Sequence, residues 1–262
     1  MLNKLFLKYR TAIIGMFYIA FGLYSIYIIQ NATVLSTKIF YGCLAILLLS
    51  VSIYSEYLRH LYNKAIRTLT MDVNPELARK QMDYLLKRDV LKAYKNSELI
   101  FNTLYASDML EIEYGLNLLE KNKKFFHSSL DQLLIYHYSK FYLSFLKEDF
   151  TTTINEYSYL IRLKNSKVKG NKVSPLYNWE FINAIYQFAR KNYKTSINIF
   201  HTINIKNMNH RELMHLYYQM GNIYAKTKDF VKALECYNLC IENCYTSAIK
   251  EHAINERRKL PV

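Results

Sequence analysis

Two long runs without a charged side chain lie in the first sixty residues and limit what this part of the chain can fold into. The first, from Thr11 to Gln30, reads TAIIGMFYIAFGLYSIYIIQ, and the second, from Ile39 to Ser55, reads IFYGCLAILLLSVSIYS. About twenty apolar residues in an α-helix match the ~30 Å hydrocarbon core of a bilayer. The second run reaches that length at residue 58, with Glu56 near its end. We therefore predict membrane helices at residues 11–30 and 39–58, which together form a membrane anchor, 1–58.

A cleavable signal peptide is the alternative interpretation of the first run. Its apolar core exceeds the usual length of about 7–15 residues, and no small-x-small cleavage site stands before Asn31. Basic residues precede the first run and follow the second, whereas the connecting loop carries only Lys38. These flanking residues are Lys4, Lys8, Arg10, Arg59, Lys64 and Arg67. The positive-inside rule then predicts a two-span membrane protein with both termini in the cytoplasm.

Neither run has an ionisable residue near its middle, which favours an anchor over a transporter or proton relay. Gly15 and Gly22 share one helical face, and Gly42 and Ala45 share another, so we expect the two helices to pack as a hairpin. The net charge of +14 predicts attraction to an anionic inner leaflet. Nucleic acid is the other usual partner of a basic protein, but no nucleic-acid motif occurs and we expect none to bind.

The rest of the chain has the pattern of short amphipathic helices. The whole sequence has only six Gly and three Pro, which is typical of an all-α protein. Asn74-Pro75, Ser107-Asp108 and Asp149 have the residue types that begin helices. Apolar residues recur every three or four positions, as in Leu77, Met82, Leu85, Leu110, Tyr114, Leu118, Leu133, Leu134, Tyr138 and Phe141. We predict a connector at 59–73 and a helical cytoplasmic domain at 74–262.

The clearest repeat runs from Leu216 to Tyr237 and reads LYYQMGNIYAKTKDFVKALECY. It resembles a tetratricopeptide repeat (TPR), although the closing Pro of that family is absent. A small residue is needed where two helices cross closely, and aromatic rings fill the gaps between helices. The family's structural positions correspond to Tyr217, Met220, Gly221, Tyr224, Phe230, Ala233 and Tyr237.

Upstream segments repeat this pattern more weakly. Residues Tyr193–Phe200 match the second helix, with Ser196 at the small position, and Trp179–Ala189 provides the first helix. A weaker copy runs from Phe150 to Tyr157, and residues 74–122 show only the helix-pair pattern. Residues Ser247–Leu260 have the polar character of a capping helix. We predict a TPR-like α-solenoid of about five helix pairs.

The resemblance implies a concave groove that binds a peptide or protein segment. The groove positions correspond to His215, Tyr218, Asn222, Ala225 and Lys226 in the best repeat. Asn222 would hydrogen-bond an extended backbone, and Lys226 would pair with a carboxylate. The leading hypothesis is a membrane-anchored cytoplasmic scaffold or adaptor.

Two other functions stay open. A bacteriocin-immunity or transporter-accessory membrane protein would place specificity in the hairpin. A peptide-sensing regulatory protein, similar to bacterial cytoplasmic receptors, would need an effector domain, for which residues 59–73 leave no room.

Catalytic signatures are missing: there is no Gly-rich phosphate loop, Gly-x-Ser-x-Gly elbow or His-Glu-x-x-His motif. Cys236, Cys240 and Cys244 share a helical face and could bind a soft metal, but burial as small apolar residues is the favoured interpretation. We expect no enzyme activity, cofactor or metal. Three lysines in the loop at 164–175 are candidates for lipid contact: Lys167, Lys169 and Lys172. The alternative interpretation is a solvated loop.

Overall fold

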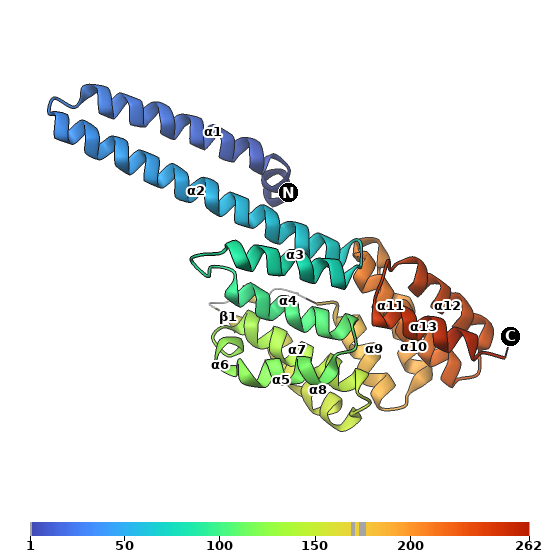
Figure 1. Cartoon of the computed structure of the whole chain (residues 1–262). Helices are drawn as coiled ribbons and strands as arrows, with labels where there is room; N and C mark the ends of the chain where they lie inside the picture. Colours follow the sequence, from blue (N-terminus) through green and yellow to red (C-terminus); the bar gives the residue numbers. More distant parts are fainter. Residues whose placement is uncertain (1, 169–170, 173–176, 262) are drawn as a thin grey trace. The chain divides into compact units, whose positions relative to one another are not determined.

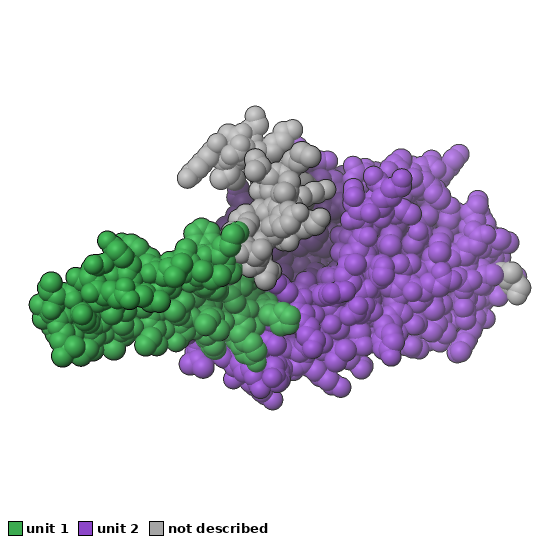
Figure 2. Space-filling model, turned by 90° about the horizontal axis from the view of Figure 1, so that it is seen from above, with its two compact units in different colours: residues 1–60 green, residues 61–262 purple. Residues whose placement is uncertain are grey.

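The computed structural model describes residues 2–168, 171–172 and 177–261, with side chains described for 15–166 and 177–261. Within these residues, all regular structure is helical except for two strands of two residues each (Figure 1). The prediction of an all-α fold is confirmed. Two compact units divide the chain: unit 1 is Met1–His60 and unit 2 is Leu61–Val262 (Figure 2).

Unit 1 contains α1 (Leu2–Asn31) and most of α2 (Leu35–Thr70). Among the residues searched, α2 is the one helix long and apolar enough to cross a membrane. This helix continues without a break to Thr70, so it includes most of the segment expected to be a connector, 59–73. The physical reason is that residues 59–70 contain neither Gly nor Pro and bury Ala65 and Leu69, which favours helix continuation.

Unit 2 contains the remaining helices and a short antiparallel ribbon in which Lys167 pairs with Lys172. Its elements are α3 (Pro75–Arg88), α4 (Lys95–Asp108), α5 (Ile112–Lys121), α6 (Lys123–Phe126), α7 (Leu130–Leu146), α8 (Phe150–Lys164), β1 (Lys167–Val168), β2 (Asn171–Lys172), α9 (Trp179–Ala189), α10 (Tyr193–Thr202), a 3₁₀ helix (Ile205–Asn207), α11 (His210–Lys226), α12 (Phe230–Glu242) and α13 (Ala248–Arg258).

The predicted helix starts have different outcomes. Asn74 caps α3, with Pro75 at the first helical position, and Asp149 caps α8. The prediction of a helix start at Ser107-Asp108 is wrong, because these two residues form the end of α4. The reason is that their side chains are used for tertiary contacts with α11, not for a cap.

One turn recurs four times in unit 2. It joins α4 to α5, α7 to α8, α9 to α10 and α11 to α12, and each copy has three residues with a positive φ at the middle one. The middle residues are Leu110, Glu148, Lys191 and Lys228, with φ between 54° and 63°. In every copy the following N–H donates to the carbonyl five residues earlier, as Asp229 does to Tyr224. Non-Gly residues seldom adopt this conformation, so its recurrence indicates one helix-pair design used repeatedly.

The second helix of each pair buries a small residue four positions after its N-cap. These residues are Gly115, Thr153, Ser196 and Ala233. A Cβ at Gly115 would lie 2.7 Å from Leu143 Cδ1, and the Ser196 hydroxyl donates to the Ala184 carbonyl at 2.7 Å. Gly221 plays the same part in α11, because a Cβ there would lie 2.6 Å from the Tyr237 ring. Small side chains therefore set how closely each pair of helices packs.

Helices of unit 2 pack mainly on their neighbours along the chain, from α3 and α4 through to α12 and α13. Some contacts depart from this order, among them those of the turn between α2 and α3. The Val73 carbonyl accepts a hydrogen bond from the Thr246 N–H at 3.1 Å, and the Met71 carbonyl lies 2.7 Å from His210 Nδ1. The turn between α2 and α3 is therefore held by the C-terminal helices.

Candidate functional site

A hollow of about 470 Å³ lies among the first helices of successive pairs. Its apolar side is formed by Phe145, Phe188 and Phe150. The residues that complete its lining are Leu146, Glu148, Tyr218, Gln219, Asn222, Ala225, Lys226, Tyr237, His252 and Glu256. Helices α7, α9 and α11 contribute most of it, Phe150 of α8 and Tyr237 of α12 add one residue each, and α13 contributes His252 and Glu256. Elements from more than a hundred residues of sequence therefore form one surface.

Four of the five groove positions expected from the sequence line this hollow, namely Tyr218, Asn222, Ala225 and Lys226. The Tyr218 hydroxyl lies 2.8 Å from His252 Nδ1 on α13, and burial raises the pKa of Tyr218 to about 12. The side-chain amide oxygen of Asn222, Oδ1, accepts a hydrogen bond from the Tyr237 hydroxyl at 2.8 Å. Lys226 is exposed at the rim. The structure thus brings together an aromatic ring, an amide and a cation on one wall.

His215 lies elsewhere. Its side chain is buried, and both ring nitrogens already have partners, Asp108 at 2.7 Å and Tyr142 at 2.8 Å. It does not line the hollow that holds Tyr218 and Asn222. The reason is that its face of α11 packs on α4 and α7 rather than on α13, which corrects its assignment to the groove.

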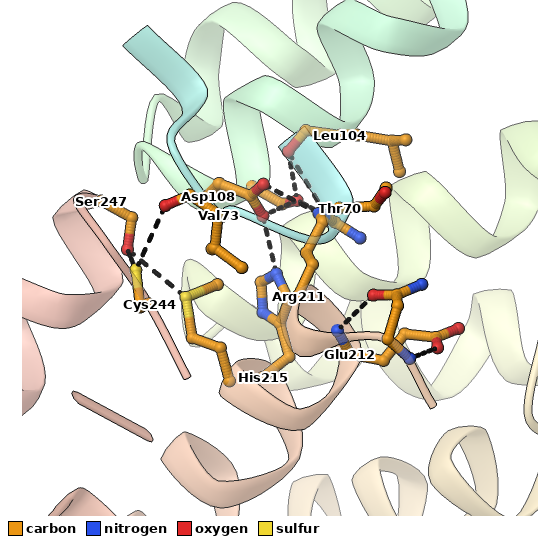
Figure 3. A network of polar contacts seen from close by, with 12 residues as sticks. Thr70, Val73, Leu104, Asp108, Arg211, Glu212, His215, Cys244 and Ser247 are labelled. Atoms are coloured by element: carbon orange, nitrogen blue, oxygen red, sulfur yellow. Dashed lines mark hydrogen bonds and ion pairs between the residues drawn. The ribbon is translucent and has the colours of Figure 1, made fainter. Parts of the chain in front are cut away.

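His215 belongs to a buried polar network centred on Asp108 (Figure 3). Arg211 Nε lies 2.8 Å from Asp108 Oδ2, and Arg211 also donates to the Ser107 hydroxyl at 2.8 Å. His215 Nε2 donates to the other Asp108 oxygen. The network ties the end of α4 to the start of α11, which are about a hundred positions apart in sequence.

The network fixes the charge of its members. Burial opposes ionisation of Asp108, but the Arg211 charge and the His215 hydrogen bond outweigh it and hold the carboxyl pKa below its ordinary value. Burial and the nearby Arg211 charge lower the pKa of His215. At neutral pH the pair is therefore an ionised carboxylate and a neutral imidazole, which donates from Nε2 and accepts at Nδ1.

Hydrogen bonds connect this network to the hollow. The Tyr237 hydroxyl donates to Asn222, whose amide donates to Gln219 at 3.3 Å. The Gln219 amide donates to the Tyr142 hydroxyl at 3.2 Å, and Tyr142 donates to His215. All these bonds point in the same direction, from the wall of the hollow towards Asp108. Such a chain holds Asn222 and Gln219 in fixed orientations and so preorganises the wall.

The cysteines and the loop lysines singled out in the sequence are not among the described residues that line this hollow. Cys236, Cys240 and Cys244 are buried, and desolvation raises their thiol pKa values, for Cys244 to about 11. Lys167 and Lys172 lie in the two-stranded ribbon with side chains outside the description, and Lys169 lies outside the described residues. Among the residues searched, no group of three or more His, Cys, Asp and Glu could hold a metal ion.

The structural positions of the C-terminal repeat are packed in the core. Gly221, Tyr224, Ala233 and Tyr237 are buried. Tyr217 is partly buried and packs against the same cluster, and Phe230 is partly buried. No protein-family model matches the sequence, and neither a curated protein nor a solved structure matches the chain.

Sequence reasoning missed the Asp108 network and the part of α13 in the hollow. A buried acid that pairs with a distant base leaves no periodic pattern. One signal was available: Arg211 and His215 are four positions apart on α11, and so face the same way.

Proposed function

We propose that this protein is a membrane-anchored cytoplasmic adaptor that binds an extended segment of a partner protein in the hollow. The observation that carries the proposal is the composition of the hollow, whose wall comes from the first helices of successive pairs and from α13. Helical-repeat proteins use this concave surface for recognition. The partner segment would place apolar side chains against Phe145 and Phe188 and its backbone beside Asn222.

A TPR-like solenoid is the architecture that we propose for unit 2. Support comes from the four identical three-residue turns and from the small buried residue at the same place in each second helix. Nearest-neighbour packing along the chain is the expected behaviour of such an array. The helix α13 would be its cap, with Ile249 and Ala253 turned inward.

A two-span hairpin is the anchor that we propose. The apolar length of α2 supports the second span. The uncharged run Thr11–Gln30 within α1 supports the first, and a shared apolar lining that includes Phe21, Ile28 and Leu48 supports pairing of the two helices. Basic residues on both outer flanks would keep the termini, and therefore unit 2, in the cytoplasm.

A binding role fits the Asp108–His215 pair better than catalysis does. Such a pair can act in acid–base chemistry only when the imidazole reaches a substrate. Here both nitrogens of the imidazole are bonded within the protein, and the Asp108 side chain is fully buried. We therefore propose that the pair positions α11 and that the protein has no enzymatic activity, cofactor or metal.

In-cell crosslinking followed by purification tests the proposal. The test variant carries Tyr218→Ala, Asn222→Ala and Lys226→Ala. The matched control changes the same residue types at exposed positions outside the hollow: Tyr245→Ala, Asn198→Ala and Lys194→Ala. We expect a partner that is lost in the test variant and kept in the control, at equal membrane abundance.

Tyr218 is buried, so loss of the partner in the test variant could result from misfolding. A second variant, which changes only exposed residues, tests the hollow without this effect. Exchanging the rim charges by Glu148→Lys and Lys226→Glu leaves the core intact, because both side chains are exposed. This variant should also lose the partner. An unchanged partner in both variants contradicts the groove assignment.

Replacing residues 1–58 by an unrelated two-span hairpin separates the adaptor from the immunity or transporter-accessory function. The adaptor keeps its partner after the exchange. Loss of the partner would place specificity in the hairpin.

A further inference from the structure

The loop between α3 and α4 carries two strongly exposed apolar side chains. Val90 and Leu91 are 80% and 72% exposed, more than any large apolar side chain described in the membrane-type helices α1 and α2. A soluble surface seldom presents two adjacent apolar side chains at the tip of a loop, and such exposure marks an interaction site.

This loop has a defined conformation. The Asp89 carboxylate accepts a hydrogen bond from the Tyr94 N–H at 2.7 Å, and the Asp89 carbonyl accepts one from the Lys92 N–H at 3.1 Å. Lys92 has a φ of 53°, which turns the chain sharply after Leu91. The Asp89 side chain is thus turned inward and the two apolar side chains outward.

Basic residues flank the apolar tip on both sides along the chain. Lys87, Lys92 and Lys95 are exposed, and the Arg88 guanidinium lies over the Tyr84 ring. The one acidic residue between positions 87 and 96, Asp89, is buried. Lys92 and Lys95 share a shallow pocket with Glu98, so the exposed side chains next to the tip are mostly cationic. An apolar tip flanked by cations has the chemistry of a surface that enters the headgroup layer of an anionic membrane.

The loop packs against the part of α2 that belongs to unit 2. The Tyr94 ring packs on the Tyr62 ring with centroids 5.1 Å apart, and Tyr62 also hydrogen-bonds Ser97. Tyr62 follows Leu58, the last residue of the proposed span, by four positions in one continuous helix, which corresponds to about 6 Å along its axis. Paired tyrosines at this level are typical of a membrane interface.

We propose that the loop 89–94 is a second membrane contact, which inserts Val90 and Leu91 into the interfacial layer of an anionic bilayer. The inference rests on the proposed membrane span in α2. It gives unit 2 a second point of attachment to the bilayer, so that the array cannot rotate freely about α2. The hollow is then presented to its partner in a restricted orientation.

Depth-dependent fluorescence quenching in the full-length protein tests this contact. A polarity-sensitive label is placed at Leu91→Cys, Leu47→Cys or Val231→Cys in a Cys43→Ser background, because Cys43 is the exposed native thiol among the described residues. Leu47 lies mid-span in α2, and Val231 is exposed on α12. Vesicles contain equal parts phosphatidylcholine and phosphatidylglycerol, with bromine on the acyl chains near either the carbonyl or the methyl end.

Each position has a distinct expected result. The Leu47 label is quenched most by bromine near the methyl end. The Leu91 label is quenched by bromine near the carbonyl end and protected from aqueous iodide. The Val231 label is quenched by iodide alone. Changing Lys87, Lys92 and Lys95 to Glu abolishes bromine quenching at Leu91, whereas the same change at Lys194, Lys206 and Lys228 preserves it.

The outcomes distinguish failure of the loop contact from failure of the anchor. No bromine quenching at Leu47 overturns the span and with it the proposed membrane anchor. Quenching at Leu47 with iodide quenching at Leu91 overturns the loop contact alone. A blue-shifted Leu91 label that bromine does not quench would show that a protein surface covers the loop, which also overturns the lipid contact.

Discussion

Large apolar side chains face opposite environments in the two units. In unit 2, Phe101 and Phe141 are fully buried between helices, whereas in unit 1 Phe17 is 70% exposed and Leu47 is 60% exposed. Removal of apolar surface from water is the main favourable term in folding, so a helix that exposes large apolar side chains along its length favours an apolar surrounding. The comparison shows that the large apolar side chains of unit 2 form its own core, and the exposed apolar side chains of unit 1 agree with the proposed membrane anchor.

Glycines show the same contrast at the level of single atoms. A Cβ at Gly221 would lie 2.6 Å from the Tyr237 ring, whereas a Cβ at Gly22 would meet nothing within 4 Å. Unit 2 therefore depends on close helix contacts that unit 1 does not make at Gly22. The glycine and helix-end substitutions below compare the two units, whereas the carboxylate and acidification tests probe the core of unit 2.

Removing the buried carboxylate by Asp108→Ala should have the largest effect. It leaves the partly buried Arg211 and the buried His215 without their carboxylate partner, which costs about 3–5 kcal/mol of unit 2 stability. Unfolding of the full chain in detergent can be followed by the single tryptophan, Trp179 on α9, because its fluorescence reports unit 2 alone.

Asp83→Ala is the control for this measurement. Asp83 pairs with Arg79 at the surface, where an ion pair contributes about 0–1 kcal/mol. Equal losses for Asp83→Ala and Asp108→Ala would contradict a stabilising role for the buried network.

Ala substitutions at the two glycines should have opposite signs. Ala is favoured over Gly in a helix by about 1 kcal/mol, so Gly22→Ala is neutral or stabilising. At Gly221 the Tyr237 ring blocks the new methyl group, and overpacking costs about 1–3 kcal/mol. Thermal unfolding followed by Trp179 fluorescence and by total helix content measures both; a stabilised Gly221→Ala protein would show that the helices are not in close contact there.

Acidification should destabilise unit 2. The native pKa of His215 is lowered, so the unfolded state takes up a proton first as the pH falls below the unfolded value of about 6.5. Stability is therefore complete above that pH and declines below it, by on the order of 1 kcal/mol per pH unit at most. Asp108, whose native pKa is also lowered, adds a further loss below about pH 4.

Denaturant titrations between pH 7 and pH 5 measure this slope. His215→Gln removes the titrating group and should flatten the profile, at the cost of lower stability throughout. An unchanged slope in His215→Gln would assign the pH dependence to other groups.

The smallest difference is expected at the helix ends. Asn74→Ala removes the cap of α3 and a contact with Thr246, with an expected cost of about 1 kcal/mol. Asn31→Ala at the exposed end of α1 should stay within about 0.5 kcal/mol of the parent. The melting temperatures of the two variants give the comparison. An equal decrease in both would contradict a larger stabilising contribution from the Asn74 cap than from Asn31.

Much of the helical pattern could be predicted from the sequence because it depends on local signals. Trp179–Ala189 was predicted with its observed bounds, and Gly221 was assigned to a close helix contact that the structure shows. Asn74-Pro75 likewise begins a helix as expected. Helix caps, the spacing of apolar residues and the positions of small residues can each be recognised in a short stretch of sequence.

Long-range features could not be predicted in the same way. Ser107-Asp108 has the local pattern of a helix start, and only its pairing with Arg211 shows why it ends a helix instead. His215 was assigned to the groove by its repeat position, but the neighbouring α4 and α7 bury it. The part of α13 in the hollow depends on how the array curves, which a single repeat does not specify.

Site-specific photocrosslinking in living cells tests whether a partner protein binds in the hollow. A photoreactive amino acid replaces Lys226 at the rim of the hollow or Lys194 on the exposed side of α10, in otherwise native protein. A membrane-anchored adaptor predicts a discrete crosslinked partner from position 226 that is absent from position 194. No adduct at position 226, or the same adducts at both positions, would contradict partner binding in the hollow.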